Sequence, residues 1–230
     1  MNIRFFAVVI GVIFISIFSS FNTVQAHRPI FVDSSPSLAD PVEIIDPEVS
    51  WAIYGQLEEG EVDYFRFTVP SGGIEFYAQM TVPKRGGEQE FVQWFAIIGT
   101  ELSLDDSISV ELPYEHGAVL VPPEDAHEEF FEPFTQTQYL LCQNARKQLL
   151  PGVYYLAVFH PDDDTGKYSL TVGEREVWGW RDLLRFPGIW LRVRLWYNTG
   201  QTISLLISII VIGFMLVFFS LSAGNMIFGG

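Results

Sequence analysis

The chain has 230 residues, of which 49% are hydrophobic and 15% aromatic, and its formal net charge at pH 7 is −15. Residues 27–173 hold 25 acidic residues against 7 basic ones, and a domain this acidic repels phosphate backbones, which excludes nucleic acid as a partner. Cys142 is the single cysteine, so an intramolecular disulfide is excluded and the domain must be stabilised by its apolar core.

The first 26 residues have the order of residue types found in a secretory signal peptide. Arg4 supplies the positive start, residues 5–18 are apolar except for Gly11 and Ser16, and Ala26 ends a run suited to cleavage. An uncleaved N-terminal anchor is the alternative, although this apolar run is short for a bilayer that needs about 20 residues. Either interpretation places the middle of the chain outside the cytoplasm.

The next part of the chain is expected to form an all-β, jelly-roll-like sandwich. Residues 27–48 are expected to be an extended N-terminal segment, and residues 49–173 the sandwich itself. Strands are predicted over 64–69, 74–82 and 91–98, because aromatic and β-branched residues gather there between glycine and proline turns. Many short strands at this spacing favour two packed sheets.

The stretch 111–137 interrupts this pattern. It combines four prolines with many acidic residues, and it is predicted to be a long acidic loop. Strand character returns near Cys142, which is expected to be a small buried apolar residue. Further on, the turn formers in 160–166 predict a hairpin between strands over 153–159 and 168–172.

Residues 174–200 are expected to be a juxtamembrane collar, because aromatic rings alternate there with basic side chains, as in the lipid head-group layer. The predicted interface residues are Trp178, Trp180, Arg181, Arg185, Trp190, Arg192, Arg194, Trp196 and Tyr197. Period-two alternation over 189–196 permits a strand on the domain, and an interfacial helix is the alternative.

A transmembrane helix is predicted over 201–222. Residues 203–221 carry no charge, and 19 helical residues span roughly 28 Å, which matches the hydrocarbon layer. A buried core helix would carry a polar stripe, which is absent here. The signal peptide then implies an outer domain and a short cytoplasmic tail over 223–230, although the collar arginines oppose the positive-inside tendency.

Three segments resemble the bacterial pre-peptidase C-terminal domain, a jelly-roll β-sandwich of secreted proteins. They are GEVDYFRFTV over 60–69, LPGVYYLAV over 150–158 and GKYSLTV over 166–172. The resemblance implies a non-catalytic module that binds or positions other molecules, and it transfers no binding residue to this chain.

Copper is one chemical possibility. If cleavage follows Ala26, the mature chain begins at His27, whose amine and ring nitrogen can chelate copper with a second histidine, His116, His127 or His160. His127 also begins a zinc-protease-like pattern, but Phe131 stands where a second histidine is needed, so that activity is excluded.

A structural calcium ion is another possibility, because Asp162, Asp163 and Asp164 offer hard oxygen ligands near the acidic residues of 111–137. Their spacing matches no EF-hand loop, and an acidic turn is usually solvated.

Two functions therefore remain open. The first is a membrane-anchored, non-enzymatic interaction module that contacts the lipid bilayer and a protein partner in the envelope. The second is an extracytoplasmic copper protein that uses His27.

Overall fold

The structure is a computed structural model that describes residues 27–85, 91–103, 108–124, 128–133, 135–177 and 179–228. The predicted signal peptide over 1–26, His127 and Trp178 lie outside the described residues. The described chain divides at residues 193 and 194 into two compact units, a sandwich unit and a helix unit, which are taken separately below.

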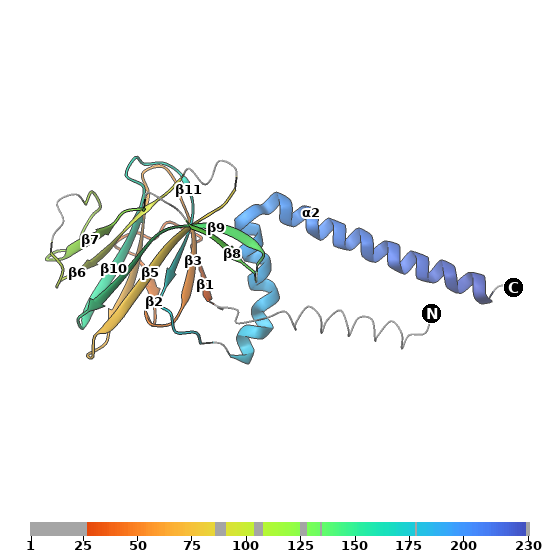
Figure 1. Cartoon of the computed structure of the whole chain (residues 1–230), viewed down its shortest axis with the longest axis horizontal. Coiled ribbons are helices and arrows are strands. Elements are labelled where there is room, and N and C mark those ends of the chain that lie inside the picture. Colours follow the sequence, from red (N-terminus) through yellow and green to blue (C-terminus); the bar gives the residue numbers. More distant parts are fainter. Residues whose placement is uncertain are drawn as a thin grey trace. The chain divides into compact units, whose positions relative to one another are not determined.

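The sandwich unit consists of two β-sheets (Figure 1). The six-stranded sheet has the order β1-β3-β11-β5-β9-β8, with β1 (Arg28–Phe31), β3 (Trp51–Leu57), β11 (Gly166–Val172), β5 (Ile74–Pro83), β9 (Thr137–Leu149) and β8 (Glu128–Glu132). The five-stranded sheet has the order β2-β4-β10-β6-β7, with β2 (Val42–Ile44), β4 (Val62–Val69), β10 (Gly152–Phe159), β6 (Trp94–Gly99) and β7 (Gly117–Val121). A mainly β fold of two sheets is thus confirmed.

The core lies between the two sheets, because every second residue of the central strands is apolar and points inward. In β4 these are Phe65, Phe67 and Val69, and the Phe67 ring stacks on Phe76 of β5 with 4.8 Å between ring centroids. The outer face of the five-stranded sheet carries a second apolar cluster that includes Ile98. The outer face of the six-stranded sheet is polar instead, and it holds the candidate site.

Two glycines make room for two buried tyrosines. Tyr168 lies directly opposite Gly55 on β3, and Tyr154 lies opposite Gly99 on β6. A Cβ atom on Gly55 would come within 2.3 Å of the Tyr168 ring. Each ring therefore lies over its glycine partner, an arrangement that covers a residue with no side chain of its own.

One carboxylate is buried at the end of the core. Asp63 on β4 has no exposed surface, and one of its oxygens accepts the hydroxyl hydrogen of Tyr168. The other oxygen, Oδ1, has no hydrogen-bond partner among the described residues. Burial raises the pKa of Asp63 to about 6, partly offset by the hydrogen bond from Tyr168.

The segment 27–48 contributes a strand to the edge of each sheet. β1 pairs in parallel with β3, and β2 pairs in parallel with β4. The N–H groups of Arg28 and Val32 point toward β3, donating to Ser50 and Tyr54, so the ring nitrogen of Pro29 faces the open edge. The expected extended segment therefore contains two edge strands.

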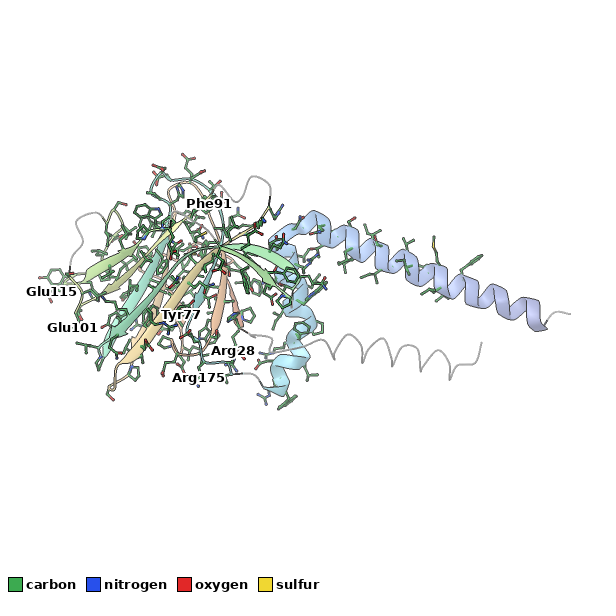
Figure 2. All side chains as sticks on the ribbon, viewed as in Figure 1. Arg28, Tyr77, Phe91, Glu101, Glu115 and Arg175 are labelled. Carbon is green, nitrogen blue, oxygen red and sulfur yellow. The ribbon has the colours of Figure 1, made fainter. Side chains whose placement is uncertain are left out.

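The prediction of one long loop over 111–137 is wrong, because β7 and β8 lie within it. The short apolar run Ala118–Val121 pairs with β6, and the acidic sequence EEFFE of β8 pairs with β9. The prolines mark the connections around these strands. Glu101 and Glu115, which precede β7, lie at the end of the sandwich away from Arg28 (Figure 2).

The predicted hairpin is also wrong, although both of its strands exist. β10 belongs to the five-stranded sheet and β11 to the six-stranded sheet, so the turn over 160–165 crosses between sheets. Cys142 is buried in β9 as predicted, and burial raises the pKa of its thiol to about 12.

The collar is helical from Trp180 onward, so the strand considered over 189–196 is wrong and the alternative, a helix, is observed. Helix α2 (Trp180–Phe228) runs from the end of the sandwich unit through the helix unit, with non-helical backbone angles at Asn198. The Asn198 side-chain oxygen accepts the N–H of Gln201 at 3.0 Å, which is N-cap geometry. A new helix therefore starts after Asn198 and carries the apolar sequence.

Candidate functional site

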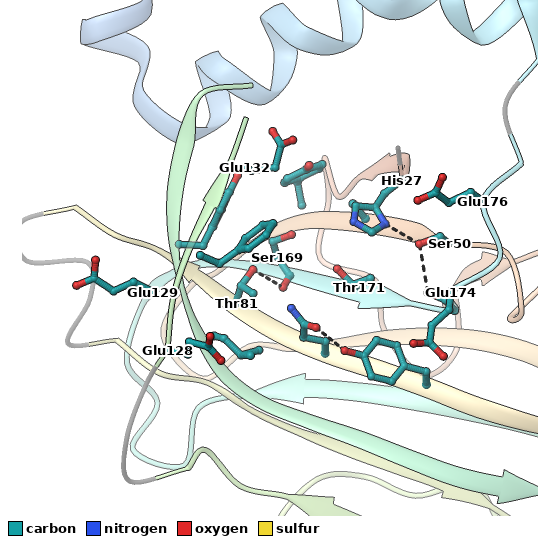
Figure 3. A pocket seen from close by; sticks show the side chains of 18 residues that line it. His27, Ser50, Thr81, Glu128, Glu129, Glu132, Ser169, Thr171, Glu174 and Glu176 are labelled. Carbon is teal, nitrogen blue, oxygen red and sulfur yellow. Dashed lines mark hydrogen bonds between the residues drawn. The ribbon is translucent and has the colours of Figure 1, made fainter. Parts of the chain in front are cut away.

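A cavity of about 280 Å³ lies on the polar outer face of the six-stranded sheet (Figure 3). Its floor comes from outward positions of β3, β11, β5 and β9, and β8 contributes one wall. Its lining residues are His27, Ser50, Ala52, Tyr54, Tyr77, Gln79, Thr81, Glu128, Glu129, Phe130, Glu132, Tyr139, Leu141, Ser169, Thr171, Gly173, Glu174 and Glu176. The cavity thus combines hydroxyl groups, carboxylates and one imidazole.

His27 is held in this cavity by Ser50. Its Nδ1 lies 2.6 Å from the Ser50 hydroxyl oxygen, and that hydroxyl lies 3.2 Å from the carbonyl oxygen of Gly173, which it can donate to. Because a serine has one hydroxyl hydrogen, both bonds form together only when His27 Nδ1–H is the donor to Ser50. Nε2 of His27 is then an acceptor.

Burial keeps this imidazole neutral. Removal from water lowers the pKa of His27, while the carboxylates of Glu132 and Glu176 act in the opposite direction. A neutral ring with a protonated Nδ1 agrees with the hydrogen bonds to Ser50 and Gly173.

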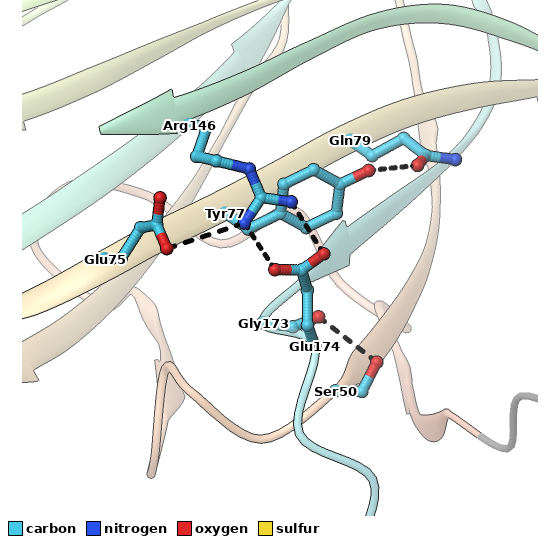
Figure 4. A network of polar contacts seen from close by, with 7 residues as sticks. All are labelled: Ser50, Glu75, Tyr77, Gln79, Arg146, Gly173 and Glu174. Carbon is cyan, nitrogen blue, oxygen red and sulfur yellow. Dashed lines mark hydrogen bonds and ion pairs between the residues drawn. The ribbon is translucent and has the colours of Figure 1, made fainter. Parts of the chain in front are cut away.

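A network of polar contacts forms the rim beside Tyr77 (Figure 4). Arg146 on β9 makes two hydrogen bonds to Glu174, at 2.6 and 2.7 Å, and its guanidinium lies 4.7 Å from the centroid of the Tyr77 ring. The Tyr77 hydroxyl donates to Gln79. The hydrogen bonds from Arg146 lower the pKa of Glu174, and burial raises that of Tyr77. This rim is preorganised, because each of its long side chains has a partner.

Replacing the two serines of the cavity is expected to have unequal effects on stability. Ser50 is 3% exposed and bonds to His27 and Gly173, whereas Ser169 is 5% exposed and its hydroxyl has no partner among the described residues. Ser50→Ala is expected to lower the free energy of unfolding by about 1–2 kcal/mol, because buried partners lose their hydrogen bonds.

Ser169→Ala is the matched control, and it is expected to stay within about 0.5 kcal/mol of the original chain. Denaturant titration of both variants in the same detergent measures the difference. Equal losses in the two variants would contradict the hydrogen-bond assignment at Ser50.

The described histidines of the copper hypothesis lie in separate places. Nδ1 of His116 bonds to the carbonyl of Tyr114 at 2.8 Å, and its ring meets Tyr155 of the five-stranded sheet edge to face. His160 stacks on Phe91. Over the described residues, no three His, Cys, Asp or Glu side chains form a group that could hold a metal ion. Nδ1 of His27, which the proposed chelate needs, is already bonded to Ser50.

The aspartates of the calcium hypothesis form a turn around His160. The N–H groups of Asp162 and Asp164 both lie 3.3 Å from His160 Nδ1, and Asp163 has a φ of 57°. The Asp164 carboxylate accepts the N–H of Thr165 at 2.8 Å. These contacts organise a turn between the two sheets.

Part of the predicted collar is fixed to β1 inside the sandwich unit. Arg28 pairs with Asp182 at 3.3 Å, and Arg192 pairs with Asp33 while its guanidinium lies 4.2 Å from the Phe31 ring centroid. A groove of about 940 Å³ runs between β1 and this part of α2. Its exposed lining includes four predicted interface residues, namely Trp180, Arg181, Arg185 and Arg192.

The other interface residues are distributed along α2. Trp190 lies in the sandwich unit, whereas Arg194, Trp196 and Tyr197 belong to the helix unit and directly precede Asn198. Leu184–Phe218 is long and apolar enough to cross a membrane, with a mean hydropathy of 2.4 in its most apolar window. Over the described residues it is the one helix with these properties.

Most cavity residues are missing from the sequence-based predictions, which named only His27. The usable signal was the polar residue at every second strand position, as in Ser169 and Thr171 on β11 or Gln79 and Thr81 on β5. This alternation marks an outward face but does not show which strands are neighbours.

Comparison with solved structures finds similar chains, among them one domain of a collagenase. The pre-peptidase C-terminal domain of a collagenase from Bacillus anthracis matches 65% of this chain and 97% of its own, with a TM-score of 0.30 and 14% sequence identity. The resemblance stated from the three sequence segments thus recurs. No protein-family model and no curated protein matches the chain.

Proposed function

We propose that the protein is a membrane-anchored, extracytoplasmic interaction module with a jelly-roll-like sandwich, and that it binds a protein partner in the envelope without catalysing a reaction. The observation that carries this proposal is the order of the sandwich and the apolar helix along the chain. A sandwich with a preformed polar cavity is followed by a capped helix whose side chains are apolar on all sides.

The exposed apolar surface of α2 supports the membrane anchor. Residues such as Ile210, Phe214 and Phe218 are more than half exposed, and the run has no polar stripe. Exposing such a large apolar surface to water is unfavourable for a soluble monomer, whereas the lipid chains of a bilayer solvate it. The signal-like sequence of residues 1–26 favours the outer location of the sandwich.

The strand order supports the jelly-roll-like description. From β3 to β6, consecutive strands alternate between the two sheets, as do β9, β10 and β11. Such crossings are typical of Greek-key sandwiches of the jelly-roll class.

The hydrogen-bond direction at His27 supports a binding role over catalysis. A nucleophilic serine gives its hydrogen to the imidazole, whereas Ser50 can donate to the Gly173 carbonyl and accept from His27. Ser50 is also almost fully buried. The pair therefore resembles a structural clamp.

Removal of residues 199–230 is expected to move the protein from the membrane fraction to the soluble fraction, because the apolar helix is lost. Alkaline carbonate extraction followed by immunoblotting measures this. The matched control lacks only residues 222–230, which leaves the uncharged run intact, and it should stay in the membrane pellet.

Protease added to intact cells, or to spheroplasts where an outer membrane blocks access, tests the orientation. Residues 27–173 are expected to be digested. If the sandwich is protected from the protease, the extracytoplasmic location is wrong. If the protein without residues 199–230 stays in the membrane pellet after carbonate extraction, the proposed anchor is wrong.

A further inference from the structure

The cavity on the six-stranded sheet is rich in hydrogen-bond acceptors. Three of its five glutamates already have partners: Glu129 pairs with Lys84 at 2.5 Å, Glu174 pairs with Arg146, and Glu132 accepts hydrogen bonds from Thr135. Glu128 and Glu176 have no cationic partner among the described residues. They lie on opposite sides of the cavity (Figure 3). The carboxylates without a cationic partner therefore give both sides of the cavity a negative charge.

His27 adds a neutral acceptor to these carboxylates. Its Nδ1 hydrogen is directed to Ser50, so Nε2 presents a lone pair. The cavity therefore suits a ligand with several N–H donors better than a carboxylate or phosphate, which the glutamates would repel.

Ser169 is the second observation that indicates a ligand. It lies on the cavity floor between Glu128 and Glu129 on one side and Glu174 and Glu176 on the other (Figure 3), and the residue is 5% exposed. Its hydroxyl opens into the cavity and has no partner among the described residues, whereas the polar groups of residues this buried are normally hydrogen-bonded. A donor that enters the cavity would satisfy it.

From these features we infer that the cavity binds an ammonium or guanidinium group, supplied by a basic side chain of a partner protein or by a free amine. The volume of about 280 Å³ lies just below the usual range for drug-sized ligands, so it suits a group of side-chain size. This inference rests on the proposed interaction role and adds the chemistry of recognition.

The test uses the full chain in lipid nanodiscs and isothermal titration calorimetry. The probes are a blocked Gly-Arg-Gly peptide, its lysine and citrulline counterparts, and spermidine. Citrulline keeps the shape of arginine without its charge. The two charged peptides are expected to bind at least about tenfold more tightly than the citrulline peptide, because hydrogen bonds between charged groups are stronger than those of a neutral donor.

Three variants localise the binding. The double variant Glu128→Gln, Glu176→Gln is expected to bind the arginine peptide at least about tenfold more weakly. Ser169→Ala is expected to bind it about threefold more weakly, or worse. The control, Glu59→Gln with Glu101→Gln, removes the same charge from exposed turns outside the cavity and should leave binding within about twofold.

The outcomes distinguish a basic side chain of a protein from a free amine, and they test the ligand class separately from the membrane anchor. Tighter binding of spermidine than of either peptide would assign the site to free amines. Failure of every charged probe, equal binding of the citrulline peptide, or equal losses in the cavity and control variants would overturn the inference. A chain that stays in the membrane but binds no probe would refute the ligand class alone, and the carbonate experiment tests the anchor independently.

Discussion

Replacing Gly173 by alanine is expected to lower the free energy of unfolding of the sandwich by about 2–5 kcal/mol. Gly173 has a φ of +73°, a left-handed conformation that costs other residues about 1–2 kcal/mol. A Cβ atom there would lie 2.4 Å from the carbonyl oxygen of Val49, and relief of such overpacking costs about 1–3 kcal/mol more. Domains of this size have only about 5–15 kcal/mol of stability in total.

The effect should also reach the cavity, because the Gly173 N–H donates to Tyr77 at 2.9 Å and its carbonyl can accept the Ser50 hydroxyl. Gly72→Ala is the matched control, since a Cβ atom there meets nothing within 4 Å. Urea titration of both variants measures the difference. If Gly72→Ala and Gly173→Ala lower the free energy of unfolding by similar amounts, the steric argument is refuted.

Asp63→Asn is expected to remove a pH dependence of about 3 kcal/mol from the stability of the sandwich. The pKa of Asp63 rises from 3.8 to about 6 on folding, so the fold favours the neutral carboxyl group. Its stabilising contribution is complete below pH 3.8 and is lost as the pH rises through 6. One pKa unit corresponds to about 1.4 kcal/mol, which gives the magnitude.

The quantity to measure is the difference in unfolding free energy between the original chain and Asp63→Asn, from pH 3.5 to 7.5. Other titrating groups cancel in this difference, as does the fixed cost of burying the amide. The difference should shift by about 3 kcal/mol in favour of the variant as the pH rises. The control is Glu59→Gln, an exposed carboxylate in the turn before β4. A flat profile for Asp63→Asn would contradict the raised pKa.

Strands β4 and β5 and the apolar part of α2 are predictable from the sequence because each has a local signal. Alternating aromatics such as Phe65 and Phe67 require one buried face, and glycine or proline ends each run. β7 and β8 lack such a signal. β8 contains three glutamates, and only its pairing with β9 makes it a strand.

The partners of a strand are harder to predict than the strand itself. Residues 160–166 have the composition of a hairpin turn, yet β10 pairs with β4 and β6 while β11 pairs with β3 and β5. A hairpin and a crossing between sheets use the same turn formers. Contacts between strands far apart in the sequence decide the choice.

The cavity was beyond sequence analysis for the same reason. His27, Ser50, Tyr77 and Ser169 come from four separate parts of the chain, and they meet only because β3, β11 and β5 are neighbours. The sequence could identify His27 as a chemically capable residue. It could not show that Ser50 would hold its Nδ1.

The outer strands of the six-stranded sheet limit self-association. At one edge, the nitrogen of Pro29 replaces an N–H group that a second molecule could use, and at the other edge β8 carries Glu128, Glu129 and Glu132. Proline and like charges both oppose the addition of a strand from another copy. Under the proposed membrane anchoring, copies would meet often on one surface, and these two edges would then protect against polymerisation into continuous sheets.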